Sequence, residues 1–281
     1  MKNNVISNSI LGDNLSQKNS ISSMHCSPSN GQIDLYCGDC LDILKSLSDE
    51  SVDLLVTDPP YKVTSRGCNG NSGGMFKKSI NKKGMVFEHN NIDCEIYAPE
   101  FYRILKDGSH CYVMTNHTNL IHMLNTFTSV GFHFIKSLIW NKGNKIMGQY
   151  YMSQFEYILF FRKGKGVQIN NCGTSDILSI PNKKTKDKQG QNIHDTEKPP
   201  ELMEILVANS SNEGDIVLDP FMGVGGTGVA CKSLNRKFIG IELDENYFNI
   251  AKQRIEGTYD CSVGVSIKSD KEGLEKHSWD I

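Results

Sequence analysis

The sequence predicts an α/β protein with a mostly parallel sheet that helices cover on both faces. Short apolar stretches alternate with longer stretches of helical character along most of the chain. Residues 52–57 (VDLLVT) have the composition of a buried strand and are followed closely by two prolines. A glycine-rich segment, residues 221–228, separates an expected strand from an expected helix. Together these observations favour a fold of repeated strand–helix units.

Six elements are expected in the first half of the fold, alternating from strand to helix. Asp39 precedes the first helix as a suitable N-cap. Pro59 and Pro60 prevent the second strand from continuing. The six elements are residues 33–37, 41–47, 52–57, 95–105, 109–115 and 119–130.

The second half begins with two expected strands in succession, followed by helices and strands in turn. A proline in the first turn favours the helix that begins at residue 199. The strands are residues 134–140, 154–162, 215–218 and 238–241. The helices are residues 199–209, the stretch after the glycine-rich segment through residue 234, and residues 244–255.

We expect a single domain over residues 31–257. Residues 1–30 are rich in Asn and Ser and lack periodicity, so they are expected to be a disordered leader, and residues 258–281 a flexible tail. Two polar segments, residues 62–94 and 163–195, are expected to be insertions within the domain. No apolar run is long enough to cross a bilayer, so no membrane partner is expected.

Composition excludes some classes of protein. The 281 residues carry 30 Lys and Arg against 32 Asp and Glu, which excludes a histone-like polycation. The nine cysteines are not accompanied by a recognisable secretory signal, so we expect reduced thiols in a cytoplasm. Cys37 and Cys40 have no second pair at zinc-finger spacing, so no metal site is expected.

Four acidic residues follow directly on expected strands: Asp39, Asp58, Asp219 and Glu242. In an open α/β sheet, the ligand crevice lies at the carboxyl ends of the strands. The glycine-rich segment has the pattern G-x-G-x-x-G, and Glu242 follows Asp219 by 23 residues, the position of an acid that binds ribose hydroxyls. This pattern alone indicates a cofactor that contains adenosine, so an NAD-dependent oxidoreductase remains an alternative.

The segment Asp58-Pro59-Pro60-Tyr61 narrows the choice of chemistry. The two prolines fix a stiff loop that presents a carboxylate, a carbonyl oxygen and an aromatic ring. Two acceptors suit an exocyclic amine with two N–H groups, and the ring of Tyr61 suits stacking on a base.

The DPPY segment, the glycine-rich DPFMGVGGTG and the intervening HDTEKP occur together in this chain. In this combination the chain resembles the β-group DNA amino-methyltransferases, above all the phage-type adenine-N6 enzymes. The resemblance covers roughly residues 32–256. It implies a circularly permuted, Rossmann-like methyltransferase sheet, S-adenosylmethionine as cofactor, and a bacterial cell or phage-infected host. The expected reaction is methyl transfer to N6 of a flipped-out adenine. Cytosine N4 is the alternative, because DPPY rather than SPPY favours adenine only statistically.

The resemblance also assigns residues. Asp58, Pro59, Pro60 and Tyr61 would form the site for the target amine. The cofactor would contact Asp39, Cys40, Thr196, Lys198, Asp219, Phe221, Gly223, Gly225 and Glu242. The chain departs from the family pattern at Asp195 and Glu197, which replace Pro and Gln, and at Gly226, which replaces Thr.

Two basic segments indicate double-stranded DNA as the partner. Residues 62–90 hold six basic side chains and one acidic side chain, and residues 162–198 hold eight and four. This concentration of positive charge in a chain of net charge −2 favours contact with phosphates. The first segment is expected to bind phosphates near the flipped base and the second to recognise the target sequence. The sequence leaves open whether the chain forms a homodimer.

Overall fold

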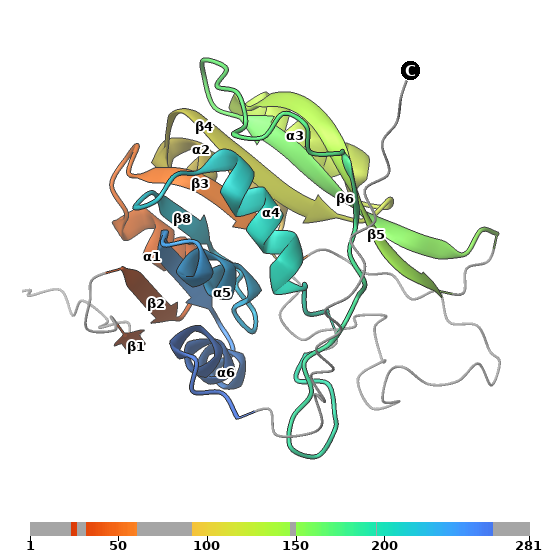
Figure 1. The fold of residues 1–281 in the computed structure, drawn as a ribbon. Coiled ribbons are helices and arrows are strands. Elements are labelled where there is room, and N and C mark those ends of the chain that lie inside the picture. The colour runs from red at the N-terminus through yellow and green to blue at the C-terminus, as the bar shows by residue number, and fades with distance from the viewer. Residues whose placement is uncertain (1–23, 27–31, 61–91, 147–149, 195, 261–281) are drawn as a thin grey trace, which may run out of the picture.

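The strands of the computed structural model form one nine-stranded sheet in the order β1-β2-β9-β8-β3-β4-β6-β5-β7. The structure describes residues 24–26, 32–60, 92–146, 150–194 and 196–260 (Figure 1). The strands are β1 (Met24–Cys26), β2 (Ile33–Cys37), β3 (Val52–Thr57), β4 (Leu105–Thr115), β5 (His133–Ile146), β6 (Ser153–Arg162), β7 (Ile177–Ser179), β8 (Ile216–Asp219) and β9 (Lys237–Glu242).

Helices cover both faces of this sheet, as the sequence predicts. They are α1 (Cys40–Ser46), α2 (Cys94–Ile104), α3 (Leu120–Val130), α4 (Pro200–Ser210), α5 (Gly226–Ser233) and α6 (Glu245–Glu256). One core lies between the sheet and the first three helices, and the other between the sheet and the last three. Among the described residues, no helix is long and apolar enough to cross a membrane.

Strands β2, β9, β8, β3 and β4 are parallel neighbours, and the fold therefore has its predicted parallel centre. The chain proceeds from β8 to β9 on one side and from β3 to β4 on the other, so its direction of progress reverses between β8 and β3. Ligands of open α/β sheets bind at such a switch point, outside the carboxyl ends of the strands.

The structure differs from the expected elements at the margins of the sheet. Residues 24–26 were expected in the leader but form β1, which pairs with β2. Strand β7 lies in the segment 163–195, where no element was expected, and pairs with β5. Strand β5 extends well beyond the expected 134–140 because its partner β6 continues to pair with it as far as Ile146.

Helix α6 ends at Glu256, one residue before the expected carboxyl-terminal limit of the domain at residue 257. Gly257 caps this helix in the left-handed conformation that glycine adopts readily. The tail from residue 261 and most of the insertion, residues 61–91, lie outside the described residues.

Candidate active site

The four predicted carboxylates lie at the carboxyl edge of the parallel strands. Asp58 follows β3 and Asp219 ends β8, so these two flank the switch point. Glu242 ends β9, and Asp39 follows β2 as the N-cap of α1. The sheet therefore brings together groups that are far apart in the sequence.

Asp58 belongs to a chain of alternating charges that runs across this edge. Lys198 donates a hydrogen bond from Nζ to Oδ2 of Asp58. The same Nζ lies 3.6 Å from Oε2 of Glu156, whose Oε1 accepts a hydrogen bond of 2.9 Å from Nζ of Lys142. We call these four residues the ion-pair chain. Both of its lysine side chains are more than nine-tenths buried.

One oxygen of Asp58 is not used by this chain. Its Oδ1 is buried and accepts no hydrogen bond from the residues that the structure describes. Burial raises the pKa of the Asp58 carboxyl, although the neighbouring Lys198 ammonium opposes the shift. Glu156 differs, because Lys198 and Lys142 lower its pKa despite its burial. Asp58 therefore presents a free acceptor at the switch point.

Asp219 connects the end of β3 to the glycine-rich loop. Its carboxylate accepts hydrogen bonds from the hydroxyls of Thr57, at 2.7 Å, and Thr227, at 2.6 Å, and from the backbone N–H of Phe221. Thr57 directly precedes Asp58, so one buried carboxylate positions both loops. Burial raises the pKa of Asp219 to about 6. These contacts give Asp219 a positioning role, and the cofactor contact that the resemblance implies for it stays a prediction.

The raised pKa of Asp219 predicts a measurable dependence of stability on pH. The folded chain binds this proton more tightly than the unfolded chain, so wild-type stability gains a contribution as the pH falls from about 7 to about 4. The Asp219→Asn protein has no ionisable group at this position. When the pH falls from about 7 to about 4, the unfolding free energy of wild type is therefore expected to rise by about 2–3 kcal/mol relative to that of Asp219→Asn. Urea denaturation at both pH values measures it, and a pH-independent difference contradicts the assignment.

The glycine-rich loop depends on glycine at particular positions. Gly223 and Gly225 have φ values of 54° and 80°, in the region that favours glycine. A Cβ atom at Gly226 would lie 2.9 Å from the carbonyl oxygen of Lys198. The departure from Thr at Gly226 thus allows this backbone to approach the start of α5.

Two further predicted cofactor residues support the loops around the site. The Glu242 carboxylate accepts hydrogen bonds from the backbone N–H groups of Gly223, at 2.9 Å, and Asp244, at 2.8 Å. Burial raises the pKa of Glu242. Phe221 packs edge-to-face against Tyr97 of α2, with the ring centroids 5.3 Å apart. Both residues therefore stabilise the conformation of the glycine-rich loop.

Asp39 and Cys40 lie at the start of α1. Asp39 accepts a hydrogen bond of 2.8 Å from the N–H of Leu41, which confirms its predicted capping role. Cys40 is buried, and burial raises the pKa of its thiol to about 12. Tyr61, predicted to stack on the target base, lies outside the described residues.

The segment before α4 contacts both Asp58 and helix α6. The resemblance predicts that Lys198 contacts the cofactor carboxylate, and in the structure its ammonium pairs with Asp58. Thr196 is exposed, and its N–H donates to Nδ1 of His194. Glu197 is buried and pairs with Arg254 of α6 at 2.6 Å. Arg254 also donates to the carbonyl oxygen of Val224 in the glycine-rich loop.

The sequence did not predict which residues contact Glu197. Thr185 donates to Glu197 from both its N–H and its hydroxyl, and Lys184 donates to the Glu197 carbonyl oxygen. Burial lowers the pKa of Lys184 to about 8. One signal was available for Glu156, because it is a charged residue within the apolar stretch of β6. The substitution of Glu for Gln at Glu197 was a second signal.

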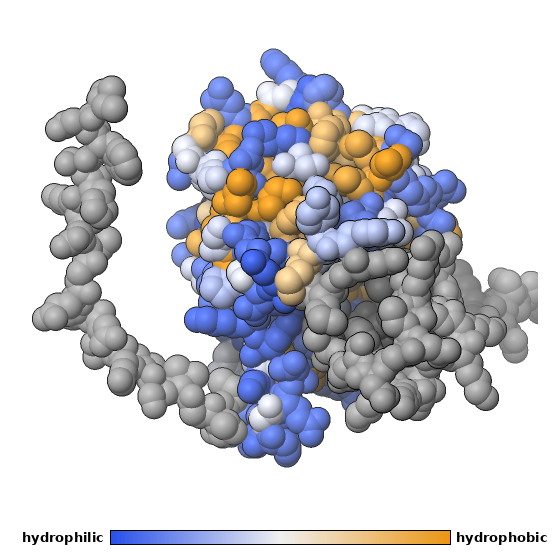
Figure 2. Space-filling model, turned by 90° about the vertical axis from the view of Figure 1, so that its right-hand side faces the viewer, coloured by the Kyte–Doolittle hydropathy of each residue, from blue (hydrophilic) through white to orange (hydrophobic). Residues whose placement is uncertain are grey.

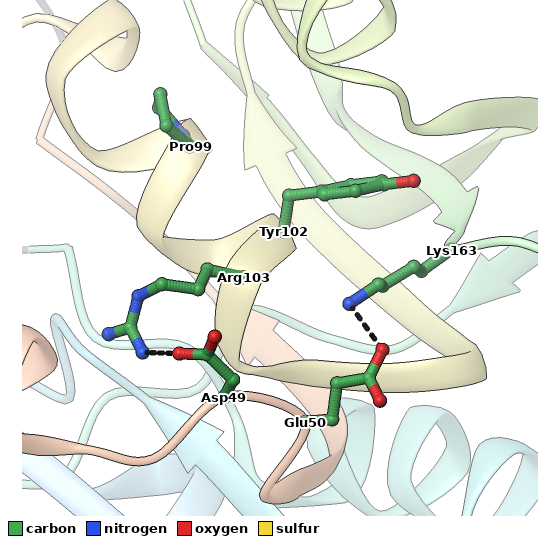
Figure 3. Close-up of a pocket in the computed structure, with 6 residues that line it drawn as sticks. All are labelled: Asp49, Glu50, Pro99, Tyr102, Arg103 and Lys163. Atoms are coloured by element: carbon green, nitrogen blue, oxygen red, sulfur yellow. Dashed lines mark hydrogen bonds and ion pairs between the residues drawn. The ribbon is translucent and has the colours of Figure 1, made fainter.

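A hollow elsewhere on the surface does not belong to this site. It lies at the opposite edge of the sheet, where β3 begins and β6 ends, and Figure 3 shows the residues that line it: Asp49, Glu50, Pro99, Tyr102, Arg103 and Lys163. Arg103 pairs there with Asp49 and caps the carbonyl oxygens of Leu44 and Leu47. These contacts stabilise the carboxyl end of α1.

The described residues include one group with the composition of a metal site: Asp93, Cys94 and His122. His122 Nε2 lies 2.8 Å from Asp93 Oδ1, and this hydrogen bond lowers the pKa of Asp93. The contact connects α3 to the first turn of α2, which explains the group as an interhelical contact.

Comparison with known proteins places this geometry in a family. The family model described as DNA methylase, of N6/N4 methyltransferases, matches residues 52–253. The type II methyltransferase M.HinfI of Haemophilus influenzae is 30% identical over 240 residues, covering 78% of this chain and 67% of that protein. M.HpaI of Haemophilus parainfluenzae is 30% identical over 251 residues, covering 80% and 74%.

Solved structures agree with this match. The M1.HpyAVI–SAM complex is 26% identical, with a TM-score of 0.59, and the match covers 79% of this chain and 99% of that one. The cytosine-N4-specific PvuII methyltransferase, at 18% identity and a TM-score of 0.63, shares the fold over 83% of this chain and 88% of that one. The chain with Asp58 and Asp219 at its switch point belongs to the DNA methylase family of S-adenosylmethionine-dependent N6/N4 methyltransferases.

Proposed function

We propose that this DNA methyltransferase transfers a methyl group from S-adenosylmethionine to N6 of an adenine that has been flipped out of the duplex. The observation that supports the proposal is Oδ1 of Asp58, which is buried and accepts no hydrogen bond from the described residues. Its segment, DPPY, matches the form that favours adenine over cytosine. Sequencing of modified bases in DNA from cells that express the protein tests this, and we expect N6-methyladenine at one recurring sequence.

The amine and its acceptors carry the chemistry. Asp58 Oδ1 and the Pro59 carbonyl oxygen would accept the two N–H groups of the target amine, which orients the nitrogen lone pair for attack. S-adenosylmethionine supplies a methyl group on a positively charged sulfur. Asp58 would also accept the proton that the amine loses, and the raised pKa of its carboxyl favours this step.

Lys198 would keep Asp58 ionised through Oδ2 while Oδ1 binds the amine. Replacement of Lys198 by Met removes the cation that opposes the rise in the pKa of Asp58. The carboxylate then protonates at a higher pH. The acid limb of the pH–rate profile is therefore expected to move upward, with activity partly restored in alkaline buffer.

Lys136→Met, an exposed lysine paired with Asp176, provides the control and should leave the profile unchanged. The KM for S-adenosylmethionine distinguishes this role from the cofactor contact that the resemblance predicted. A Lys198→Met protein with an unshifted profile and a raised KM would assign Lys198 to the cofactor instead.

The residues present fit the cofactor. A loop shaped by Gly223 and Gly225 opens the start of α5, where backbone N–H groups favour the cofactor's carboxylate. Glu242, whose carboxylate accepts hydrogen bonds from the N–H groups of Gly223 and Asp244, lies beside this loop and would bind the ribose hydroxyls. Asp39 and Cys40 would flank the adenine, and Thr196 and Phe221 would lie along the rest of the cofactor.

Glu242→Ala is expected to weaken S-adenosylmethionine binding about 10- to 150-fold, because a charge-assisted hydrogen bond contributes about 1.5–3 kcal/mol. Titration calorimetry measures this affinity, with Glu245→Ala, the next glutamate along the chain, as control. Affinity equal to wild type would remove Glu242 from the ribose site. Tighter binding of NAD than of S-adenosylmethionine would revive the oxidoreductase alternative.

We propose that double-stranded DNA binds at the edge of the sheet that carries Asp58. The basic segment 162–198 reaches this edge, because its residue Lys198 donates a hydrogen bond to Asp58. The other basic segment, residues 62–90, lies outside the described residues, and in the sequence it begins two residues after Pro60. We propose that the first recognises the target sequence and the second binds phosphates.

A further inference from the structure

The end of the β5–β6 hairpin exposes aromatic side chains. Tyr150 is 86% exposed and Tyr151 is 93% exposed. Met152 and Phe155 on the same hairpin are about half exposed. Adjacent apolar groups at such exposure indicate a surface that binds a partner.

The hairpin extends beyond the carboxyl edge of the sheet, on the side of the active site. Thr115 ends β4 and pairs with Tyr157 of β6, so residues 150–156 lie past the end of β4. Figure 1 shows β5 and β6 projecting in this direction, and Figure 2 views the molecule from that side. Glu156 contacts Lys198, the partner of Asp58. At about 3.3 Å per residue, Tyr151 lies within roughly 17 Å of Glu156.

The charge of the hairpin end favours a nucleic acid as the partner. Residues 141–146 and 150–155 of the hairpin include no acidic residue, and Lys142 is already buried and paired with Glu156, so Lys145 is the lysine available to a partner. Lys145 is exposed. Aromatic rings beside lysines are the combination with which proteins stack on bases and contact phosphates.

We propose that this hairpin end enters the base stack of duplex DNA at the position that the target base leaves. The inference rests on the proposed function. A flipped base leaves a gap between its neighbours, and closing the duplex over that gap competes with methylation. The rings of Tyr150 and Tyr151 fill the gap by stacking, while the base reaches Asp58 at the root of the hairpin.

The test compares wild type with a Tyr150→Ala/Tyr151→Ala protein on two substrates. On a fully paired duplex, the methylation rate at limiting DNA concentration is expected to fall about 5- to 150-fold, the range for loss of base–aromatic stacking. On a duplex with an abasic site opposite the target, the loss is expected to be much smaller, because extrusion then costs less. A Tyr150→Phe/Tyr151→Phe protein keeps both rings and should retain the wild-type rate.

Val167→Ala, an exposed apolar residue beside the opposite edge of the sheet, is the matched control and should behave as wild type. An unchanged rate in the double alanine variant overturns the proposal. An equal loss of rate on both substrates also overturns the proposal. So does a loss of rate that accompanies dissociation of a dimer, as measured by sedimentation. A wild-type protein that methylates neither substrate contradicts the proposed function itself, which keeps the two failures distinct.

Discussion

Methyl transfer is expected to fall at least about a hundredfold in the Asp58→Ala protein, while the affinity for S-adenosylmethionine stays near wild type. The substitution removes one of two acceptors that orient the amine in the transition state, and such a group contributes on the order of 3 kcal/mol. Lys198 still has Glu156 as a partner, so the fold should persist. Single-turnover transfer of a labelled methyl group to DNA measures the rate.

Asp49→Ala is the matched control for this loss. Asp49 is also paired with a basic residue, but it is largely exposed at the opposite edge of the sheet. Its replacement should leave the transfer rate unchanged. A wild-type rate for Asp58→Ala, with folding confirmed by circular dichroism, would show that the DPPY segment does not bind the amine.

Glu197→Ala is expected to lower the unfolding free energy by about 3–5 kcal/mol, because it leaves Arg254 buried without its partner. The same change removes the acceptor of two hydrogen bonds from Thr185. Since Arg254 also binds the glycine-rich loop at Val224, cofactor affinity should decrease as well. Chemical denaturation and calorimetry measure the two effects.

The exposed pair of Lys136 and Asp176 provides the comparison, because both side chains are about half exposed. Asp176→Ala should cost no more than about 1 kcal/mol. Arg254→Met, combined with Glu197→Ala, completes a double-mutant cycle. If the Glu197→Ala protein is as stable as the Asp176→Ala protein, the buried pair has no part in joining α6 to the segment before α4.

The carboxylates at strand ends could be predicted because a parallel sheet aligns its carboxyl ends. Asp58 and Asp219 need only their own strands to reach the same edge, and the strands have local signals. The capping role of Asp39 is likewise local to the turn before α1. Such features follow from short stretches of sequence.

The ion-pair chain could not be predicted in this way. Lys198 is 140 residues from Asp58, and the pairing depends on how the segment before α4 crosses the sheet edge. Glu156 and Lys142 meet only because β5 and β6 pair in a particular register. The resemblance placed Lys198 near the cofactor, and three-dimensional contacts were needed to place its ammonium beside the proposed amine site.

The departures from the family pattern also became interpretable only in three dimensions. Gly226 leaves space for the backbone of Lys198, and Glu197 pairs with Arg254 from the last helix. Neither partner is near in sequence to the residue that it explains.

The most direct measurement is mass spectrometry of nucleosides from unmethylated DNA after incubation with the purified protein and S-adenosylmethionine. N6-methyladenine is the methylated nucleoside expected with wild type, and it should be absent with Asp58→Ala. N4-methylcytosine in its place, or no methylated nucleoside with wild-type protein that binds S-adenosylmethionine, would contradict methyl transfer to adenine N6 at Asp58.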